Sequence, residues 1–313
     1  MTELLPLLRD PGRDPAGGPA PGASGSSAAV PVPPTGRERV RRAARFLAHR
    51  PGLVVAVLYV LLVLCAAVAP SVLAGGDPLT GVPAQRLRPP SAAHVFGTDY
   101  LGRDLYTRVV HGASLSLRAT VLAVAVGLLV GGLIGLLAGF IGRWVDEGLM
   151  RFVDTLLAIP SILLSLALIT ALGYGTTKVA IAVGVASVAS FARVMRAETM
   201  RVRRATYVEA ARSVGTRWYT TLRRHVLPNA AGPVLVLAVL EFGLAILQVS
   251  ALSFLGYGAP PPAPEWGALI AEGRNYLANS WWLCTMPGFA IAATVLSVNR
   301  ISRALDGEWA RFR

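Results

Sequence analysis

The sequence has little charge and almost no lysine. Charged residues make up 15% of the 313 residues, whereas soluble proteins carry about 25%. One lysine, Lys178, accompanies 29 arginines, and the net charge is +13. The arginines lie beside long apolar stretches. The positive-inside rule, by which basic residues stay on the cytoplasmic side of a membrane, explains this distribution better than nucleic-acid binding does. We therefore expect a protein that contacts membrane lipid and no nucleic acid.

Residues for covalent chemistry are also scarce. The two cysteines, Cys65 and Cys284, have no metal-binding or redox spacing, and the four histidines are scattered over different segments. No G-x4-G-K-[S/T] nucleotide loop, HExxH motif or GxSxG motif occurs. We expect no catalytic residues, no metal site and no cofactor in this chain. An energy-driven role would need partners that supply the chemistry.

Long apolar stretches predict six membrane spans, because about 20 apolar residues cross a bilayer. The predicted spans are residues 53–69, 119–141, 149–172, 179–195, 232–255 and 283–298. The expected fold is therefore an all-α integral membrane protein. Residues 1–36 are rich in proline, glycine, alanine and serine, and this composition predicts a disordered tail.

The arginine distribution predicts the orientation of these spans. Six arginines occupy residues 37–50, before the first span, and nine occupy residues 193–224, between the fourth and fifth spans. In this topology 21 of the 30 basic residues lie on one side and six on the other. The positive-inside rule then predicts that both termini are cytoplasmic.

Four glycines recur in the second predicted span, each four residues after the previous one: Gly127, Gly131, Gly135 and Gly139. This spacing places them on one helix face, where the absence of side chains lets a neighbouring helix approach at backbone contact. We expect static packing in a multi-helix bundle rather than contact with a substrate.

Few polar groups occur within the spans. Glu241 and Gln248 are seven residues apart, which is two helical turns, so they share a face. An acid at bilayer depth costs about 2–3 kcal/mol or more unless it is paired or hydrated, and it usually faces a cavity or pathway. Two interpretations stay open: this face lines a substrate route, or the two side chains form structural hydrogen bonds within the bundle.

The segment between the fourth and fifth spans predicts a short helix followed by a sharp turn. Thr206 and Glu209 have the spacing of a capping box. Ala210 and Ala211 leave a flat surface that another protein can approach closely. Gly215 suits the left-handed residue that ends a helix. The pattern predicts a rigid knob on the cytoplasmic side.

Leu227-Pro228 follows this helix, and the proline is expected to interrupt the next helical segment. The complete string, from Glu209-Ala210-Ala211 through Gly215 to Leu227-Pro228, resembles the EAA signature in the membrane subunits of ABC importers. The resemblance implies that residues 206–228 contain a coupling helix, which contacts an ATPase subunit.

Two further stretches carry a more specific resemblance. Residues 96–108 read FGTDYLGRDLYTR and, taken alone, predict a polar surface segment with a short helix. Residues 253–258 read SFLGYG and precede Glu265-Trp266-Gly267. Both stretches are similar to dipeptide/oligopeptide ABC-importer permeases. Val249 departs from that pattern, in which a glutamate is usual.

The resemblance implies a permease with an extra N-terminal span in a bacterial plasma membrane. The expected division is a tail (1–36), an N-terminal span with an external loop (37–112), and a five-span core (113–313). Implied partners are a second homologous permease, two ATPase subunits or domains that bind ATP and magnesium, and an extracytoplasmic peptide-binding protein. Alternatives are an importer of another solute such as a nickel complex, a proton-coupled carrier, and an intramembrane enzyme.

Overall fold

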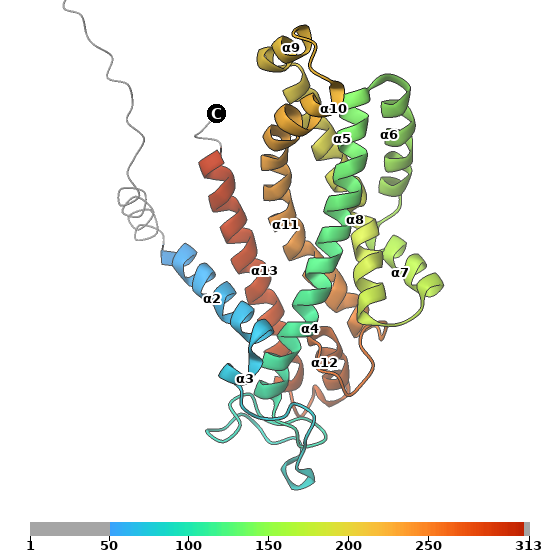
Figure 1. The fold of residues 1–313 in the computed structure, drawn as a ribbon. Coiled ribbons are helices and arrows are strands. Elements are labelled where there is room, and N and C mark those ends of the chain that lie inside the picture. The colour runs from blue at the N-terminus through green and yellow to red at the C-terminus, as the bar shows by residue number, and fades with distance from the viewer. Residues whose placement is uncertain (1–50, 310–313) are drawn as a thin grey trace, which may run out of the picture. The chain divides into compact units, whose positions relative to one another are not determined.

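The computed structural model describes residues 51–309. Within this range, helices are the only regular secondary structure apart from one isolated bridge between Thr98 and Asp104. The long helices run alongside one another as a bundle (Figure 1). The predicted tail at residues 1–36 and the arginines at 37–50 lie outside the described residues.

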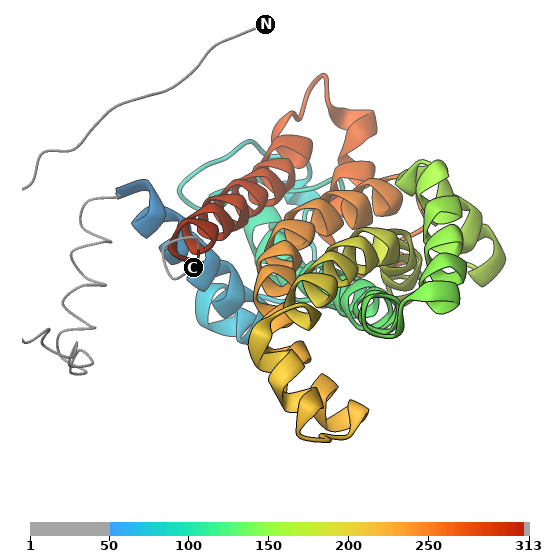
Figure 2. The same cartoon turned by 90° about the horizontal axis from the view of Figure 1, so that it is seen from above.

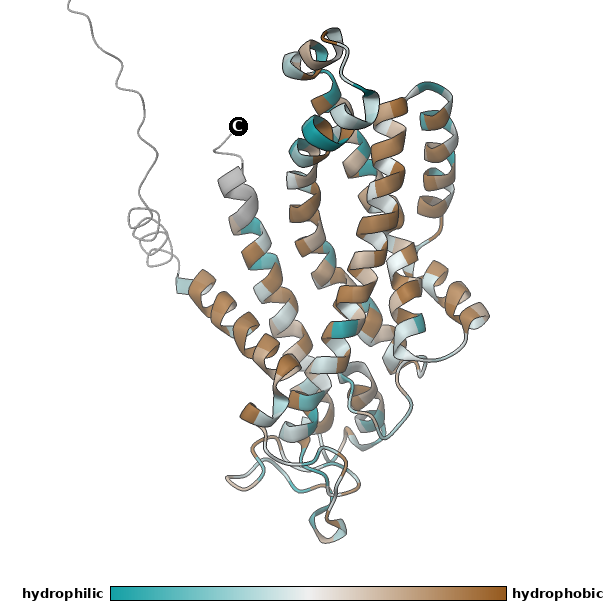
Figure 3. Cartoon of the chain, in the orientation of Figure 1, coloured by the Kyte–Doolittle hydropathy of each residue, from teal (hydrophilic) through white to brown (hydrophobic). Residues whose placement is uncertain are grey.

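Five helical segments of the described chain are long and apolar enough to cross a membrane: Pro51–Val68, Leu105–Ile141, Thr176–Arg203, Trp218–Phe254 and Trp282–Ala304. A sixth candidate is the bent pair of α6 (Arg143–Ala158) and α7 (Ser161–Leu172). Apolar residues cover these helices, and hydrophilic residues gather in the connections at the two ends (Figure 3). The prediction of an all-α membrane protein is confirmed.

The first long segment is α2 (Pro51–Val68), and the second joins α4 (Leu105–Val126) through the π-helical turn η2 (Gly127–Gly131) to α5 (Gly132–Ile141). The later long segments are α8 (Thr176–Arg203), α11 (Leu227–Phe254) and α13 (Trp282–Trp309). The short elements are α3 (Pro70–Leu73), η1 (Pro83–Gln85), α9 (Thr206–Ser213), α10 (Trp218–Thr221), η3 (Leu222–Val226), α12 (Trp266–Gly273) and η4 (Arg274–Tyr276). We call the end of the bundle that carries α9 the α9 end, and the opposite end, with residues 74–104 and 256–281, the loop end.

The third predicted span is not one straight helix. Helices α6 and α7 meet at an angle of 95°. Pro160 has no backbone N–H and disfavours a helical conformation in the preceding residue. Ile159 accordingly adopts an extended conformation, with φ −96° and ψ 126°. The third predicted span, residues 149–172, is therefore a broken helix pair that remains a candidate sixth span.

The second span begins earlier than predicted. Asp104 caps α4, because its carboxylate accepts a hydrogen bond of 2.9 Å from the Thr107 amide. The residues before Asp104 form irregular structure, in which Thr98, Asp99 and Arg103 are buried. The expectation of a polar surface segment with its own short helix at residues 96–108 was therefore wrong.

Pro228 does not interrupt the fifth span in the way expected. The chain stays helical from Trp218 to Phe254. The π-helical turn η3 lies directly before Leu227 and Pro228, so the proline occupies the first turn of α11. A missing N–H is tolerated in the first turn of a helix. The proline therefore coincides with a change of helix type rather than a break.

Helix α8 occupies a central position in the bundle. It packs against α4, α5, α7 and α11. In the view from above, it lies between α11 on one side and the α4–α5 segment on the other (Figure 2). Because α9 follows α8 directly, the contacts of α8 determine where the knob is held.

The four glycines of the second span lie against α8. A Cβ atom on Gly139 would come within 2.8 Å of the Arg196 carbonyl oxygen, and one on Gly135 would contact the Ala192 carbonyl. Gly127 and Gly131 make similarly close approaches to the same helix. Such contact favours glycine, because an added side chain would collide with the backbone of α8 at Gly131, Gly135 and Gly139 and with the side chains of α8 at Gly127.

We expect Gly131→Ala to destabilise the protein, because its Cβ would collide with the Val188 carbonyl and lie 2.8 Å from Phe191 Cβ. Overpacking of this kind costs about 1–3 kcal/mol. The matched control is Gly132→Ala, whose Cβ would meet only Met195 Cε, at 3.7 Å. The melting temperature of each variant in detergent checks the prediction, and an equal effect of both substitutions would contradict it.

Candidate functional site: the protruding helix α9 and the polar face of α11

Helix α9 begins close to the predicted position. The carbonyl of Ala205 accepts hydrogen bonds from the amides of Val208, at 2.9 Å, and Glu209, at 3.2 Å. Ala205 therefore occupies the N-cap position, and Thr206 is the first helical residue. The predicted capping box is wrong by one residue, although the helix itself is present.

Gly215 ends α9 in the conformation expected of it. Its φ angle is +79°, in the left-handed region. The next residue, Thr216, donates a 3.2 Å hydrogen bond from its amide back to the Ala211 carbonyl. This is the six-residue closing bond of a Schellman motif, which relies on a left-handed residue and strongly favours glycine.

The knob is anchored through one buried side chain. Val208 is completely buried and belongs to a cluster that also contains Val202 of α8, Val226 of η3 and Ala230 of α11. Val208 was not among the residues expected from the sequence, although an aliphatic residue in a short amphipathic helix was the available signal. The structure therefore fixes α9 to three other elements through its inner face.

The remaining surface of the knob is open. Glu209 and Ala210 are exposed, and Ala211 is half-buried. Two large apolar side chains nearby are also exposed, Val214 at 84% and Trp218 at 64%. Large exposed apolar side chains next to a rigid turn are typical of a protein–protein contact surface. The predicted residues Leu227 and Pro228 are exposed at the base of the knob, where α11 begins.

A pocket of about 360 Å³ lies between α9 and the neighbouring ends of α5 and α8. It is lined by Gly139, Met200, Arg203, Arg204 and Glu209. Glu209 thus contributes an acidic group to a recess with two arginines. Glu209 of the EAA-like stretch and the arginine-rich end of α8 therefore share one surface.

Glu241 and Gln248 lie half-buried on the same side of α11. Ser190 of α8 hydrogen-bonds to the Glu241 carboxyl group. Gln248 Nε2 lies 3.5 Å from the hydroxyl of Ser161, the first residue of α7 beyond the bend. Gln248 Oε1 has no hydrogen-bond partner among the described residues. Both side chains thus contact neighbouring helices and remain partly accessible.

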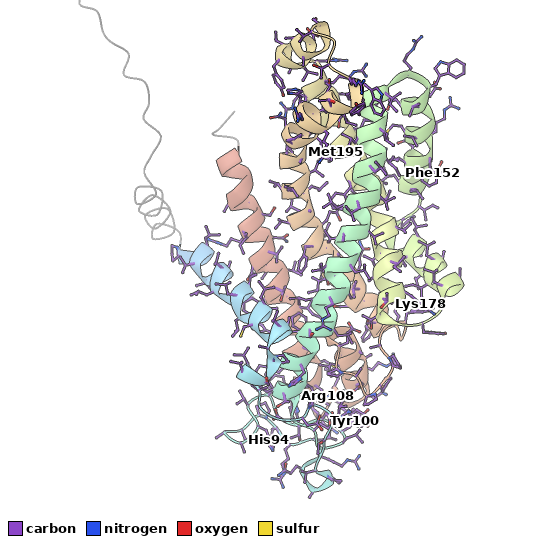
Figure 4. All side chains as sticks on the ribbon, viewed as in Figure 1. His94, Tyr100, Arg108, Phe152, Lys178 and Met195 are labelled. Carbon is purple, nitrogen blue, oxygen red and sulfur yellow. The ribbon has the colours of Figure 1, made fainter. Side chains whose placement is uncertain are left out.

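A compact charge cluster lies at the loop end. Arg108 donates to Asp99 at 2.8 Å and to Glu272 at 2.7 Å, and Arg103 donates to Asp99 at 2.6 Å. Three of the four side chains are no more than 3% exposed. Figure 4 shows Arg108 at this end of α4, near Tyr100. Buried ion pairs of this kind hold the loops in one arrangement when both partners are present.

This cluster was not expected from the sequence. Asp99, Arg103 and Arg108 belong to the stretch that resembles peptide-importer permeases, but Glu272 lies 164 residues after Arg108. Only the packing of α12 beside α4 brings the four charges together.

Residues 131–311 match the family described as binding-protein-dependent transport system inner membrane component. The dipeptide transport system permease protein DppC of Alkalihalophilus pseudofirmus is 40% identical over 223 residues, which cover 71% of this chain and 73% of that protein. The probable D,D-dipeptide transport system permease protein DdpC of Escherichia coli is 41% identical over 244 residues, which cover 78% and 82%.

The solved structure of an amino acid ABC transporter superposes with a TM-score of 0.51 at 17% sequence identity, covering 65% of this chain and 95% of that chain. A structure of the MetNI methionine ABC transporter in an inward-facing conformation gives the same TM-score, over 63% of this chain and 96% of that chain. At this level of identity both comparisons show a common fold.

The helical bundle and its relatives define a transport permease rather than an enzyme. The chain belongs to the family of inner membrane components of binding-protein-dependent transport systems, and is thus an ABC-importer permease. Membership implies an inner-membrane location and partners that include ATPases and binding proteins.

We expect Arg108→Met to destabilise the protein strongly, because it removes one of the two arginines that neutralise the buried Asp99 and Glu272. Removing one partner of a buried ion pair costs about 3–5 kcal/mol. The matched control is Arg274→Met, since Arg274 is exposed at the same end. Thermal unfolding in detergent measures both, and a similar small effect of the two substitutions would contradict a structural role for the cluster.

Proposed function

We propose that this chain forms half of the translocation pathway of an ATP-driven importer of dipeptides or oligopeptides. The printed names of DppC and DdpC, which concern dipeptide transport, support peptides as the substrate class. The match of these relatives over more than two thirds of the chain supports transfer of this substrate class to the whole permease.

The proposed assembly contains a second homologous permease, two ATPase subunits or domains that bind ATP and magnesium, and an extracytoplasmic peptide-binding protein. The α9 end faces the cytoplasm, because the arginine-rich segment 193–224 lies there. Both termini are then cytoplasmic, and the loop end faces the binding protein. In this proposal the chain has three parts: a tail at residues 1–36, an N-terminal span with its external loop at 37–112, and a five-span core at 113–313.

The single observation that carries this proposal is the construction of α9. Its inner face is tied to α8 and α11 through Val208, while Glu209 and Ala210 remain free for a partner. An ATPase that binds this surface and changes shape on binding ATP would move α9 as a rigid element. The motion would pass into α8 and α11, the two helices that flank the coupling segment.

We expect Gly215→Val to abolish ATP-driven uptake while the protein still accumulates in the membrane. A β-branched residue is strained at a φ of +79°, so the end of α9 would be displaced from its docked position. The matched control is Gly148→Val, at an exposed helical glycine with no atom within 4 Å of the added Cβ. Peptide uptake by whole cells and immunodetection of the protein in membrane fractions measure the two effects. Retained uptake in Gly215→Val would count against the coupling role.

The polar face of α11 is proposed to line the substrate route. Glu241 and Gln248 are the chain's polar groups on that face, and each is partly accessible. An ionisable group within a span is retained mainly where it meets water, a partner or a substrate. The hydrogen bonds to Ser190 and Ser161 hold the two side chains in place on this route.

We expect Glu241→Gln to reduce peptide uptake by several-fold at unchanged melting temperature, because the substitution removes charge and keeps shape and hydrogen bonding. Initial uptake rates in proteoliposomes check this. Glu147→Gln makes the same chemical change at an exposed position of α6, away from this face, and is the matched control. Unchanged uptake in Glu241→Gln would remove the pathway interpretation and leave the structural one.

A further inference from the structure

The seam between α2 and α13 carries two separate pockets. These helices pack against each other and lie side by side in both ribbon views (Figures 1 and 2). Tyr59 of α2 connects them, because its hydroxyl donates a 2.9 Å hydrogen bond to the Ala290 carbonyl of α13. One pocket lies where α2 begins and α13 approaches its end, and the other lies farther along the seam toward the loop end.

The first pocket is basic. It has a volume of about 220 Å³ and is lined by Leu53 of α2 and by Arg300, Arg303 and Ala304 of α13. The Arg300 guanidinium lies against the backbone of α2, since an added Cβ on Gly52 would be 2.5 Å from Arg300 Nη2. Glycine at this position therefore leaves room for the guanidinium between the two helices.

The charge of this pocket is not neutralised within the described side chains. No carboxylate among them forms an ion pair with Arg300 or Arg303. Arg303 Nε donates a 3.4 Å hydrogen bond to the Asn299 carbonyl, and both arginines are exposed. Two like charges in one recess repel each other, and an anion between them removes this repulsion. The planar donors of arginine match the oxygens of a phosphate group particularly well.

The second pocket is apolar and has a volume of about 150 Å³. Its walls come mainly from α2, α4 and α13, and its two tyrosines, Tyr59 and Tyr106, both donate their hydroxyl hydrogens to backbone carbonyls. Leu62 and Phe289 also line it and are 50% and 67% exposed, so the pocket opens onto the outer surface of the spans. An apolar void excludes water and lacks dispersion contacts, which a hydrocarbon chain would restore.

The separation of the two pockets matches the depth of one membrane leaflet. Along α13, Arg300 lies ten residues beyond Ala290, which corresponds to about 15 Å at 1.5 Å per residue. Along α2, Leu53 and Leu62 are nine residues apart, or about 14 Å. Half of the hydrocarbon core of a bilayer is also about 15 Å thick. A single phospholipid can therefore reach both pockets.

We propose that the seam between α2 and α13 binds one anionic phospholipid from the leaflet at the α9 end. Its phosphate lies between Arg300 and Arg303, and one acyl chain extends along the seam into the apolar pocket beside Tyr59. The bound lipid ties the N-terminal span to the core. The site is separate from α9 and from the polar face of α11, so it does not depend on which substrate is carried.

The test uses the full-length chain with the subunits that co-purify with it in mild detergent. Native mass spectrometry measures the retention of dioleoyl-phosphatidylglycerol and of dioleoylglycerol, which has the same acyl chains without the phosphate. We expect the wild type to retain phosphatidylglycerol at least about tenfold better, because each basic side chain near the membrane surface adds to the attraction of an anionic lipid. The double variant Arg300→Gln with Arg303→Gln should lose most of this preference.

The matched control is the double variant Arg223→Gln with Arg224→Gln. It removes the same charge from exposed positions at the α9 end that line neither pocket. Ala113→Leu tests the apolar pocket, because Ala113 is a buried residue of its wall. This substitution should weaken retention of dioleoyl-phosphatidylglycerol several-fold and leave that of dihexanoyl-phosphatidylglycerol unchanged, since the shorter chains do not reach the pocket.

Three results would overturn the proposal. The first is equal retention of the two dioleoyl lipids by the wild type, and the second is an equal loss of preference in the two double variants. The third is displacement of phosphatidylglycerol by inorganic phosphate at the same concentration, which would assign the arginines to a free anion. An equal effect of Ala113→Leu on long-chain and short-chain lipids would contradict the placement of the acyl chain.

Discussion

Glycine at four successive turns brings the backbone of η2 and α5 against α8. Inside lipid, apolar side chains gain little by leaving one apolar environment for another, so such close packing is a main source of helix association. Helix α8 also contacts α4, α7 and α11, and it leads directly into α9. The position of the exposed knob therefore depends on a contact that only residues without side chains permit.

The polar groups of the bundle are arranged around this packing. Asp146 accepts from Arg196 at 2.6 Å, and this ion pair fastens α6 to α8. Beyond the bend, Ser161 at the start of α7 contacts Gln248 of α11. Both halves of the bent pair pack against α8, and α7 also reaches α11 through Ser161. A change in the spacing of α8 and α11 would act on the bend between them, since proline at that point already interrupts the helix.

The two ends of the bundle use charge differently. At the loop end, Asp99, Arg103, Arg108 and Glu272 neutralise one another in a nearly solvent-free cluster, which gives the long loops a fixed arrangement. At the α9 end, Arg203, Arg204 and Glu209 line an open recess. Breaking a buried, mutually satisfied set of charges destabilises a structure, whereas accessible charges remain available to a partner. Glu265 differs from both groups, because it is buried, has no ion-pair partner among the described residues, and is held by hydrogen bonds from Ser253 and the Gly267 amide.

The sequence by itself determined the spans, the glycine face, the helix at Thr206 and the left-handed Gly215, because these depend on local composition, on helical periodicity and on the conformational freedom of one residue. It misplaced the cap by one residue and missed the bend at Pro160, since proline is tolerated in some membrane helices and its local effect depends on neighbours. Only the tertiary structure decided that Val208 anchors the knob and that Glu272 joins charges far away along the chain. These are contacts between distant segments, and no pattern within one segment specifies which partner it will meet.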